Sequence, residues 1–514
     1  MYNLQETSIE WALLHVTNFY DSDFYPRLFE FEAIKANWPN IKSHLLALDL
    51  DKYAPQTPVI SLALKPNENF RVVHQLDPID SIIYSAILYE NATNIENFRL
   101  PKGRKMACSY RIKTDTIGSY FERDVTGYVE FISQAESLAD DFEGGYVLIC
   151  DIADFYNQIY LHRVNNVLSV SGSKSSKVIE EFLSGLNTNI SRGIPVGPAP
   201  SILVAELIMA DIDKKILTYT SFFTRYVDDI YIFFEIEEDA VIVLHELTKY
   251  LYSTHRLVFS SEKTKILSVE EFKQFYLKEE ERLEKQAILE QLKDAGDGPY
   301  ETVDEVSEIE ELDPPDRFKV RSKVYLKLFS KSLELDQLDL SLTRHILRQA
   351  GKYKVRNIIP LVFKNFTKLL PAIREIVIYF DKVLNERTVE KYQKEFRRLL
   401  EHPYIDLLFI NIWIFTLFQN EWFNSIELNI DYSKIRRIRE RALIAKREKN
   451  TTWVKDIKDG VDTLGPWDKR AVCFASAIMS KDEAIHWLGL ELSKGDLLNK
   501  AVCSLAISNQ KMGK

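Results

Sequence analysis

A short acidic tip between two apolar runs constrains this chain more than any other feature. Residues 221–224 lead into Tyr226-Val227-Asp228-Asp229, and residues 230–234 lead out of it. Two β-rich runs around a short polar tip predict a hairpin. The hairpin places two adjacent carboxylates at a tight turn, where Asp is also a common structural residue. The tip alone therefore does not separate a structural turn from a functional one.

A third carboxylate, Asp151, follows another apolar strand, residues 146–150. Three acidic groups from neighbouring strand ends suit a pair of Mg²⁺ ions, which prefer hard oxygen ligands. Two such ions about 4 Å apart clamp the attacking and leaving oxygens of a phosphoryl transfer. Without a cation, carboxylates this close would repel one another. The pattern therefore indicates a metal-dependent phosphoryl-transfer site.

Ordered motifs around these aspartates resemble a reverse transcriptase over residues 60–270. They read, in chain order, LKPNENFR (64–71), RVVHQLDPIDSIIYSAI (71–87), CDIADFY (150–156), RGIPVGPAPS (192–201), RYVDDI (225–230) and EKTKI (262–266). The resemblance implies an α+β fingers and palm polymerase of the reverse transcriptase type. It also implies a nucleotidyltransferase, an RNA-directed DNA polymerase, that uses dNTPs with Mg²⁺ or Mn²⁺ as its cofactor.

The resemblance assigns the metal site to Asp151, Asp228 and Asp229, assisted by the backbone carbonyl of Ile152. These aspartates are also the expected catalytic residues. Lys263 of EKTKI is the expected proton donor to the departing pyrophosphate. A lysine at a strand end is often merely solvated, and this alternative stays open.

Two basic residues, Lys65 and Arg71, match the fingers pair that grips the triphosphate in the family. Arg71 could bind the phosphates with two parallel hydrogen bonds. A solvated basic face is the alternative for both. Gly197 belongs to the Gly-Pro loop, which lies near the template and nucleotide in the family.

The turn after the first metal motif is the expected sugar and phosphate subsite. Tyr156 matches the aromatic ring that excludes a 2′-hydroxyl and so favours deoxynucleotides; a core tyrosine is the alternative. Asp154 and Phe155 would line the same turn, with backbone amides near the triphosphate.

One departure from most reverse transcriptases is Pro195-Val196-Gly197, where Val196 replaces the usual Gln. Valine has no side-chain group that could hydrogen-bond to a template. The form GIPVGPAPS is similar to the bacterial abortive-infection (Abi) reverse transcriptases, and most to prophage-encoded members. That resemblance implies antiphage defence and DNA synthesis without a template, sometimes begun on a protein hydroxyl. Tyr20 and Tyr25 are the candidate acceptors, with packing as the alternative role for each.

Composition shifts divide the chain into four predicted segments. They are an N-terminal extension (1–60), the fingers and palm (61–275), a charged helix with an acidic linker (276–316) and an α-helical, HEAT-like repeat domain (317–514). The last rests on apolar residues recurring at i, i+3 and i+4. A basic stretch, residues 434–449, is expected to form a helix whose solvated face is favoured over a nucleic-acid surface.

Bulk composition favours a cytoplasmic protein, and the Abi resemblance implies a bacterial one. The four cysteines lack metal-like spacing, and no secretory signal or apolar run of membrane-spanning length appears. The net charge of −10 argues against a long duplex as the main ligand. Expected partners are dNTPs, the single-stranded DNA product, a phage or host trigger, and further copies of the chain in a homo-oligomer, with no membrane.

Two other functions stay open at the level of sequence. One is an RNA-templated reverse transcriptase of a mobile element. The other is a catalytically idle, reverse-transcriptase-like sensor or scaffold that signals through its helical region.

Overall fold

The computed structural model describes residues 1–66, 69–122, 127–277, 315–334 and 338–512. They belong to two compact units, each gathered from three segments. The first unit comprises Met1–Asp23, His44–Val59 and His74–Val303, and the second comprises Phe24–Ser43, Ile60–Val73 and Asp304–Lys514. The four predicted segments are contiguous, whereas these units interleave, so those boundaries stay predictions. The predicted charged helix and acidic linker lie almost wholly outside the described residues.

A four-stranded antiparallel sheet is the centre of the first unit. Its strand order is β4-β5-β3-β6, with bounds Phe223–Tyr226 (β4), Asp229–Phe234 (β5), Tyr146–Cys150 (β3) and Lys265–Ser268 (β6). β3 is flanked on both sides, so its residues are hydrogen-bonded to β5 and β6 at once. Consistent with this position, Val147, Leu148 and Cys150 are fully buried.

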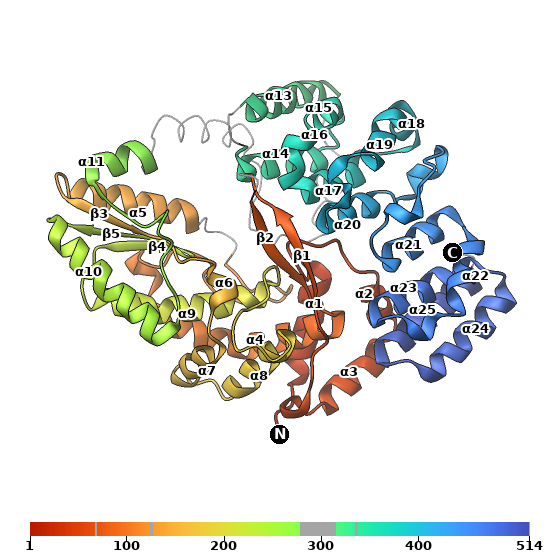
Figure 1. Ribbon diagram of the computed structural model, residues 1–514, viewed down its shortest axis with the longest axis horizontal. Helices are drawn as coiled ribbons and strands as arrows, with labels where there is room; N and C mark the ends of the chain where they lie inside the picture. Colours follow the sequence, from red (N-terminus) through yellow and green to blue (C-terminus); the bar gives the residue numbers. More distant parts are fainter. Residues whose placement is uncertain (67–68, 123–126, 278–314, 335–337, 513–514) are drawn as a thin grey trace. The chain divides into compact units, whose positions relative to one another are not determined.

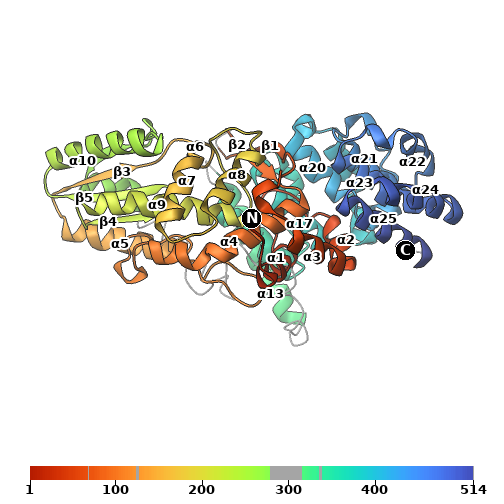
Figure 2. The ribbon, with the colours of Figure 1, turned by 90° about the horizontal axis from the view of Figure 1, so that it is seen from below.

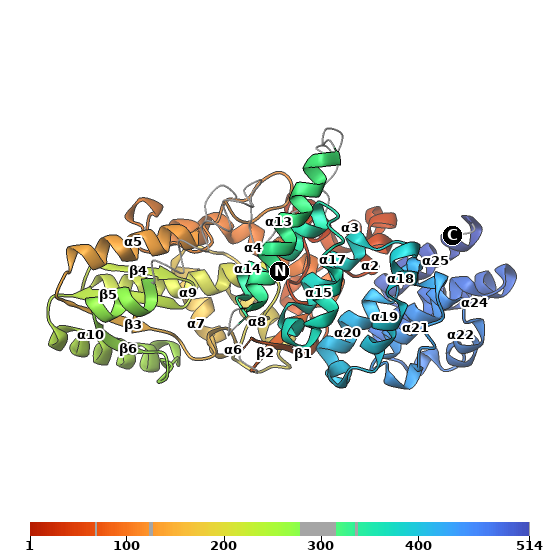
Figure 3. The ribbon, with the colours of Figure 1, turned by 90° about the horizontal axis from the view of Figure 1, so that it is seen from above.

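Helices cover both faces of this sheet (Figure 3). On one face, Val147 and Ile149 of β3 pack with Ala135 of α5 (Gly127–Asp141) and Phe272 of α11 (Val269–Phe272). α10 (Glu237–Tyr250) packs against β3, β5 and β6. Successive side chains of β3 point to opposite faces of the sheet, and helices cover both faces. Both sets of side chains are therefore buried, which explains the continuous apolar sequence of β3.

The remaining helices of the first unit form a helical layer next to the sheet. They are α1 (Glu6–Asn18), α4 (Pro78–Phe98), α6 (Phe155–Gln158), α7 (Leu161–Val170), α8 (Ser176–Leu186) and α9 (Ala199–Leu217). α4 starts sharply because the Asp77 carboxylate accepts a hydrogen bond from the Ile79 amide at 3.0 Å and Pro78 suits the first turn. α9 confirms the long helix predicted after the Gly-Pro loop, and α4 packs against it.

In its described residues, the second unit is all-helical apart from most of one hairpin, β1 (Val59–Leu64) and β2 (Phe70–Gln75). Val59, His74 and Gln75 of this hairpin belong to the first unit. Its N-terminal helices are α2 (Glu30–Ala36) and part of α3 (Trp38–Ala47). Its C-terminal helices are α13 (Pro315–Glu334), α14 (Leu340–Lys352), α15 (Ile359–Lys364), α16 (Phe366–Leu369), α17 (Ile373–Val383), α18 (Glu386–Lys391), α19 (Gln393–Leu400), α20 (Leu408–Leu417), α21 (Ile438–Glu448), α22 (Thr451–Lys458), α23 (Pro466–Ala475), α24 (Lys481–Lys494) and α25 (Leu497–Met512).

These C-terminal helices stack in sequence order. α14 packs on α17, α17 on α20, α20 on α21, α21 on α23, and α23 on α25 (Figures 1 and 2). The stacking of helices taken at intervals along the chain is the pattern of a helical repeat array. The predicted all-helical C-terminal region is confirmed.

The basic stretch at 434–449 differs from the expected solvated helix. Its helix, α21, begins only at Ile438. Arg436 is exposed, but Arg437 is mostly buried and donates to Glu440, while Arg439 is buried. The predicted single solvated face is therefore wrong for Arg437 and Arg439, because their carboxylate partners Glu440 and Glu30 are buried.

Within the described residues, no helix is both long enough and apolar enough to cross a membrane. The most apolar helix, α20, is instead buried along most of its length.

Candidate active site

The acidic tip forms a two-residue hairpin loop. Tyr226 of β4 pairs with Asp229 of β5, so Val227 and Asp228 make the turn between them. Val227 adopts a positive φ of 57°, a left-handed conformation that is strained for a β-branched side chain. Strain of this kind persists only where the surroundings over-determine it, and it gathers at functional sites.

The register of the sheet brings Asp151 to the same end as this turn. Cys150, the last residue of β3, lies opposite Ile230, the second residue of β5. Because the two strands are antiparallel, Asp151 after β3 and Asp229 at the start of β5 emerge together. The structure therefore brings the three predicted aspartates to one edge of the sheet.

Lys263 reaches this edge from the loop before β6. Its ammonium Nζ donates to Asp151 Oδ1 at 2.9 Å. Burial lowers the pKa of Lys263, but the hydrogen bond to Asp151 and the charges of Asp229 and Asp228 raise it above its usual value. Lys263 therefore carries a proton at neutral pH, as its predicted role as a proton donor requires.

The carboxylate of Asp229 is held in an unfavourable environment for its charge. Desolvation by the surrounding protein is the largest cause, followed by the negative charges of Asp228 and Asp151, and together they raise its pKa to about 7. The residue is exposed, so water screens part of this effect. A cation would relieve the repulsion.

The chemistry of these donors suits a hard divalent cation. The three aspartates offer only carboxylate oxygens. The backbone bridge between Ile152 and Phe259 is made by the carbonyl of Asp151 and the amide of Ala153, so it does not use the Ile152 carbonyl that is predicted to assist the metal. In the described part of the chain, no group of three or more His, Cys, Asp or Glu side chains is placed to hold a metal ion. Mg²⁺ does not require such a group, since it keeps several waters and takes substrate phosphates as ligands.

The predicted sugar and phosphate subsite follows Asp151 directly. Asp154 adopts a left-handed conformation (φ 49°), and its carboxylate accepts from the side-chain amide of Asn157 at 2.7 Å. The Phe155 side chain is buried in the core, so only its backbone remains available for the predicted role. Tyr156 is half-buried, with its ring edge-on to Phe155 at 5.9 Å.

The Gly-Pro loop is tied to this subsite and to strand β2. The amide of Ile194 donates to the Tyr156 carbonyl at 2.9 Å. The amide of Val196 donates to Nδ1 of His74 at 3.1 Å, and the His74 amide donates to the Val196 carbonyl at 2.9 Å. Burial lowers the pKa of His74 to about 4, so its ring is neutral and can accept that bond. Gly197 has a φ of 129°, which a residue with a side chain rarely adopts.

Lys65 and Arg71 lie on the part of the β1–β2 hairpin that belongs to the second unit. The Lys65 amide donates to the Asn69 carbonyl at 2.7 Å and closes the hairpin. Arg71 is exposed, with its guanidinium carbon 6.0 Å from the centre of the Phe24 ring. Their predicted role with the triphosphate stays a prediction.

The two candidate priming tyrosines differ in exposure. Tyr25 is fully buried in the second unit, and its hydroxyl bonds with Ser61 Oγ at 2.7 Å. Burial raises its pKa to about 12, which opposes its use as a nucleophile. Tyr20 is half-buried and belongs to the first unit. Of the two, Tyr20 fits an acceptor better.

Sequence reasoning missed a buried ionic network beneath the acidic tip. It consists of Arg225, Glu206, Asp213 and Arg99. One signal could have revealed it, because Glu206 and Asp213 lie two turns apart on one face of an otherwise apolar helix, where charges need partners. Sequence reasoning also missed His74, because nothing in the residues around it indicates that it bonds to Val196.

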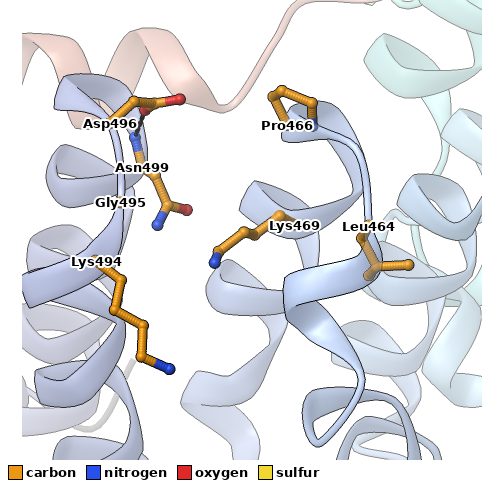
Figure 4. A pocket seen from close by; sticks show the side chains of 7 residues that line it. All are labelled: Leu464, Pro466, Lys469, Lys494, Gly495, Asp496 and Asn499. Carbon is orange, nitrogen blue, oxygen red and sulfur yellow. Dashed lines mark hydrogen bonds between the residues drawn. The ribbon is translucent and has the colours of Figure 1, made fainter.

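A separate pocket of about 190 Å³ lies within the second unit (Figure 4). Leu464, Pro466, Lys469, Lys494, Gly495, Asp496 and Asn499 line it. The two lysines are paired with Asp462 at 2.7 and 3.3 Å and with Glu491, so their charges are compensated. The pocket contains none of the predicted site residues.

Comparison with known proteins finds one family model that matches part of the chain. Residues 64–289 match the family model described as "Reverse transcriptase (RNA-dependent DNA polymerase)". No curated protein gave a match. Solved structures that match include a telomerase from Candida albicans in complex with a fragment of telomeric RNA (10% identity, 81% of this chain, 67% of that chain, TM-score 0.31). Another is an apo telomerase from Candida tropicalis (8% identity, 78% and 73% covered, TM-score 0.33).

TM-scores of this size carry no argument about function, so the assignment rests on the family model. The chain contains a reverse transcriptase domain and is a nucleotidyltransferase of that family. The predicted fold class, a reverse-transcriptase-like polymerase followed by an all-helical region, is confirmed.

Proposed function

We propose that this nucleotidyltransferase is a divalent-metal-dependent DNA polymerase that extends single-stranded DNA from dNTPs without a template, in abortive-infection defence against phage. One observation carries the polymerase part. Asp151, Asp228 and Asp229 meet at one sheet edge, and the protonated amine of Lys263 lies 2.9 Å from Asp151. This arrangement supports phosphoryl transfer rather than an idle scaffold, because crowded carboxylates are costly unless a cation uses them.

Asp151, Asp228, Asp229 and the Ile152 carbonyl would hold the metal, Mg²⁺ or Mn²⁺. When bound, divalent ions lower the pKa of the attacking hydroxyl and stabilise the charge on the leaving pyrophosphate. Lys263 holds its proton near this edge and can pass it to the departing pyrophosphate oxygen. Tyr156 would exclude a ribose 2′-hydroxyl by its ring, and Lys65 with Arg71 would neutralise the phosphates.

The Gly-Pro loop supports synthesis without a template. Both backbone groups of Val196 are already bonded to His74. The valine side chain cannot hydrogen-bond and the Val196 amide is already used, so this residue offers a template no donor. The net charge of −10 points the same way, because gripping a long duplex relies on basic surface.

The biological setting is proposed from the resemblance of GIPVGPAPS to Abi reverse transcriptases of prophages and from the helical C-terminal region that such enzymes carry. The setting is a bacterial cytoplasm, with a phage or host component as the trigger and a homo-oligomer as the working form. Initiation on a tyrosine hydroxyl of the protein belongs to this proposal, with Tyr20 favoured over the buried Tyr25.

The test is a polymerase assay on the purified full chain with Mg²⁺ and labelled dNTPs. We expect incorporation of equal extent with no template, with an RNA template and with a DNA template. Incorporation that requires RNA and copies its sequence would replace this proposal with a mobile-element reverse transcriptase. No incorporation under any condition, from folded protein, would favour the sensor or scaffold.

Priming is tested in the same reactions without any primer. Label should remain with the protein band after denaturation, and Tyr20→Phe should remove it while Tyr25→Phe should not. Label that never migrates with the denatured protein would exclude protein priming. Label that survives both substitutions would assign the acceptor to another tyrosine.

A further inference from the structure

The Arg225 side chain lies directly beneath the acidic tip and is completely buried. It belongs to β4 and precedes Tyr226. Its Nη1 donates to the carbonyl of Val227 at 2.8 Å. Val227 is the strained residue of the turn that carries Asp228, so the guanidinium holds the turn by its backbone.

Two carboxylates of α9 fix the guanidinium from the other side. Asp213 accepts from Nε and from Nη2, each at 2.8 Å. Glu206 accepts from Nη1 at 3.2 Å and from Nη2 at 3.0 Å. The planar fork of five N–H donors is therefore used in a single orientation, which a lysine ammonium cannot reproduce.

A second arginine balances the charge of this network without reaching the turn. Arg99 is also buried and pairs with Glu206 at 2.7 Å. Its other bonds go to Glu96 and to the carbonyls of Ser109 and Tyr110, and none joins the Val227–Asp228 turn among the described residues. Two arginines thus face the two α9 carboxylates, which is how a buried ionic group avoids an uncompensated charge.

We infer that Arg225 is a positioning residue of the polymerase site: it holds the strained Val227–Asp228 turn so that Asp228 is set for metal binding. The inference rests on the proposed function, since it assigns a metal to Asp228. Partners that orient metal ligands from behind are worth about 10–100-fold in metal affinity or activity when removed. Arg225 acts on the ligand through the backbone rather than through the ligand's own side chain.

The experiment compares Arg225→Lys with Arg99→Lys, because both keep a buried positive charge in the same network. Mn²⁺ binding is measured by electron paramagnetic resonance on the apo protein, beside thermal melting and Mg²⁺-dependent incorporation. Arg225→Lys should weaken Mn²⁺ binding by about tenfold or more and shift the Mg²⁺ midpoint of activity upward to match. Arg99→Lys should lower the melting temperature comparably, yet keep Mn²⁺ affinity within about twofold of wild type.

Asp213→Asn is the second variant, in case Arg225→Lys does not fold. It removes the charge that orients Arg225 and leaves the turn itself untouched, so it should weaken Mn²⁺ binding in the same direction. Unchanged Mn²⁺ affinity in folded Arg225→Lys or Asp213→Asn would overturn the inference. Equal weakening by Arg99→Lys would overturn it too. Failure of wild-type protein to bind Mn²⁺ or incorporate dNTPs would instead reject the proposed function.

Discussion

Two acidic sites, one in each compact unit, hold their carboxylates in opposite ways. At the sheet edge of the first unit, Asp229 is exposed beside two other aspartates, and its pKa is raised to about 7. In the helical unit, Glu30 is completely buried, and burial alone would raise its pKa, but Arg439 and Arg470 lower it below its usual value. At the first site one ammonium, that of Lys263, bonds to Asp151 beside three aspartates, whereas at the second site two guanidinium groups bond to a single carboxylate.

The Glu30 site shows what a structural carboxylate looks like in this chain. Arg439 donates to both of its oxygens, at 2.5 and 2.7 Å, and Arg470 approaches at 3.4 Å. The Arg439 guanidinium also lies against the Phe29 and Trp467 rings, 4.7 and 5.3 Å from their centres. Glu30 therefore ties α2 to α21 and α23, and both of its carboxylate oxygens are bonded to arginines.

The direction of the carboxyl pKa shift, rather than burial, distinguishes the two sites: the pKa of Asp229 is raised and that of Glu30 is lowered. A fold stabilises itself by pairing buried charges, as around Glu30. Carboxylates crowded beside one another cost stability, and they are retained where chemistry uses them.

Replacing both aspartates of the tip should abolish catalysis and spare the fold. Asp228→Ala with Asp229→Ala should reduce dNTP incorporation by about 10³-fold or more, which corresponds to roughly 4 kcal/mol of barrier. Unfolding free energy should hold or rise, because like-charge repulsion is removed. Incorporation assays and urea melts measure the two effects. The control is Glu237→Ala with Glu238→Ala, two exposed carboxylates of α10, which should leave incorporation unchanged. Full activity in the aspartate variant would end the metal-site interpretation.

Neutralising Glu30 should lower the stability of the fold, whereas replacing the tip aspartates should lower catalysis. Glu30→Gln leaves Arg439 and Arg470 with an unmatched buried charge, so unfolding free energy should fall by about 3–5 kcal/mol. Urea denaturation followed by tryptophan fluorescence measures it. Glu32→Gln is the matched control, because Glu32 is exposed on the same helix. A Glu30→Gln loss no larger than that of Glu32→Gln would show that the pair adds nothing.

The same pair predicts a pH dependence. Because the folded pKa of Glu30 lies below its unfolded value, its contribution is fully present above the unfolded pKa of about 4.3. It is lost as the pH falls through the folded pKa. Wild-type stability should therefore decline below about pH 4.3 more steeply than that of Glu30→Gln. Parallel declines in the two proteins would contradict this assignment.

Tyr156 should control sugar selection with a smaller effect. Tyr156→Ala removes the ring from the turn beside Asp151, so ribonucleotide use relative to deoxynucleotide use should rise by about tenfold. A competition assay with matched rNTP and dNTP measures the ratio. Tyr156→Phe keeps the ring and should retain wild-type selectivity. If Tyr156→Ala discriminates as wild type does, the ring is a packing residue.

The smallest effect is expected from Arg436. Its side chain is 51% exposed and its partner Asp406 is 70% exposed, so Arg436→Glu should change stability by no more than about 0.5 kcal/mol. Product length and its salt dependence should stay as in wild type if this face is only solvated. Shorter products with a weaker salt dependence would instead place nucleic acid along it. The neighbouring Arg437→Glu should cost far more, because Arg437 is mostly buried against Glu440.

Much of the active site could be predicted from local pattern. Apolar runs whose period and length predict strands lie directly beside Asp151, Asp228 and Asp229. Functional side chains often lie where such strands end. The long helix after the Gly-Pro loop and the helical C-terminal region follow from apolar periodicity alone. These features depend on residues within a few positions of one another.

The basic residues could not be sorted in the same way. Arg436, Arg437 and Arg439 look alike in sequence, yet one is exposed, one is mostly buried and one is buried. What separates them is the position of Glu440 and Glu30, and Glu30 is 409 residues away from Arg439. Arg225 is a similar case, because it lies on β4 and its carboxylate partners lie on the helix α9.

The sequence by itself determined which residues carry the chemistry and which secondary structures present them, since apolar periodicity and turn residues act locally. Only the tertiary structure decided three further things. The antiparallel register of β3 with β5 brings Asp151 to the tip; the burial of Arg225 anchors the strained turn; and segments 24–43 and 60–73 belong to the helical unit. Each depends on contacts between different elements of the fold, whose formation is governed by packing and charge compensation rather than by local sequence pattern.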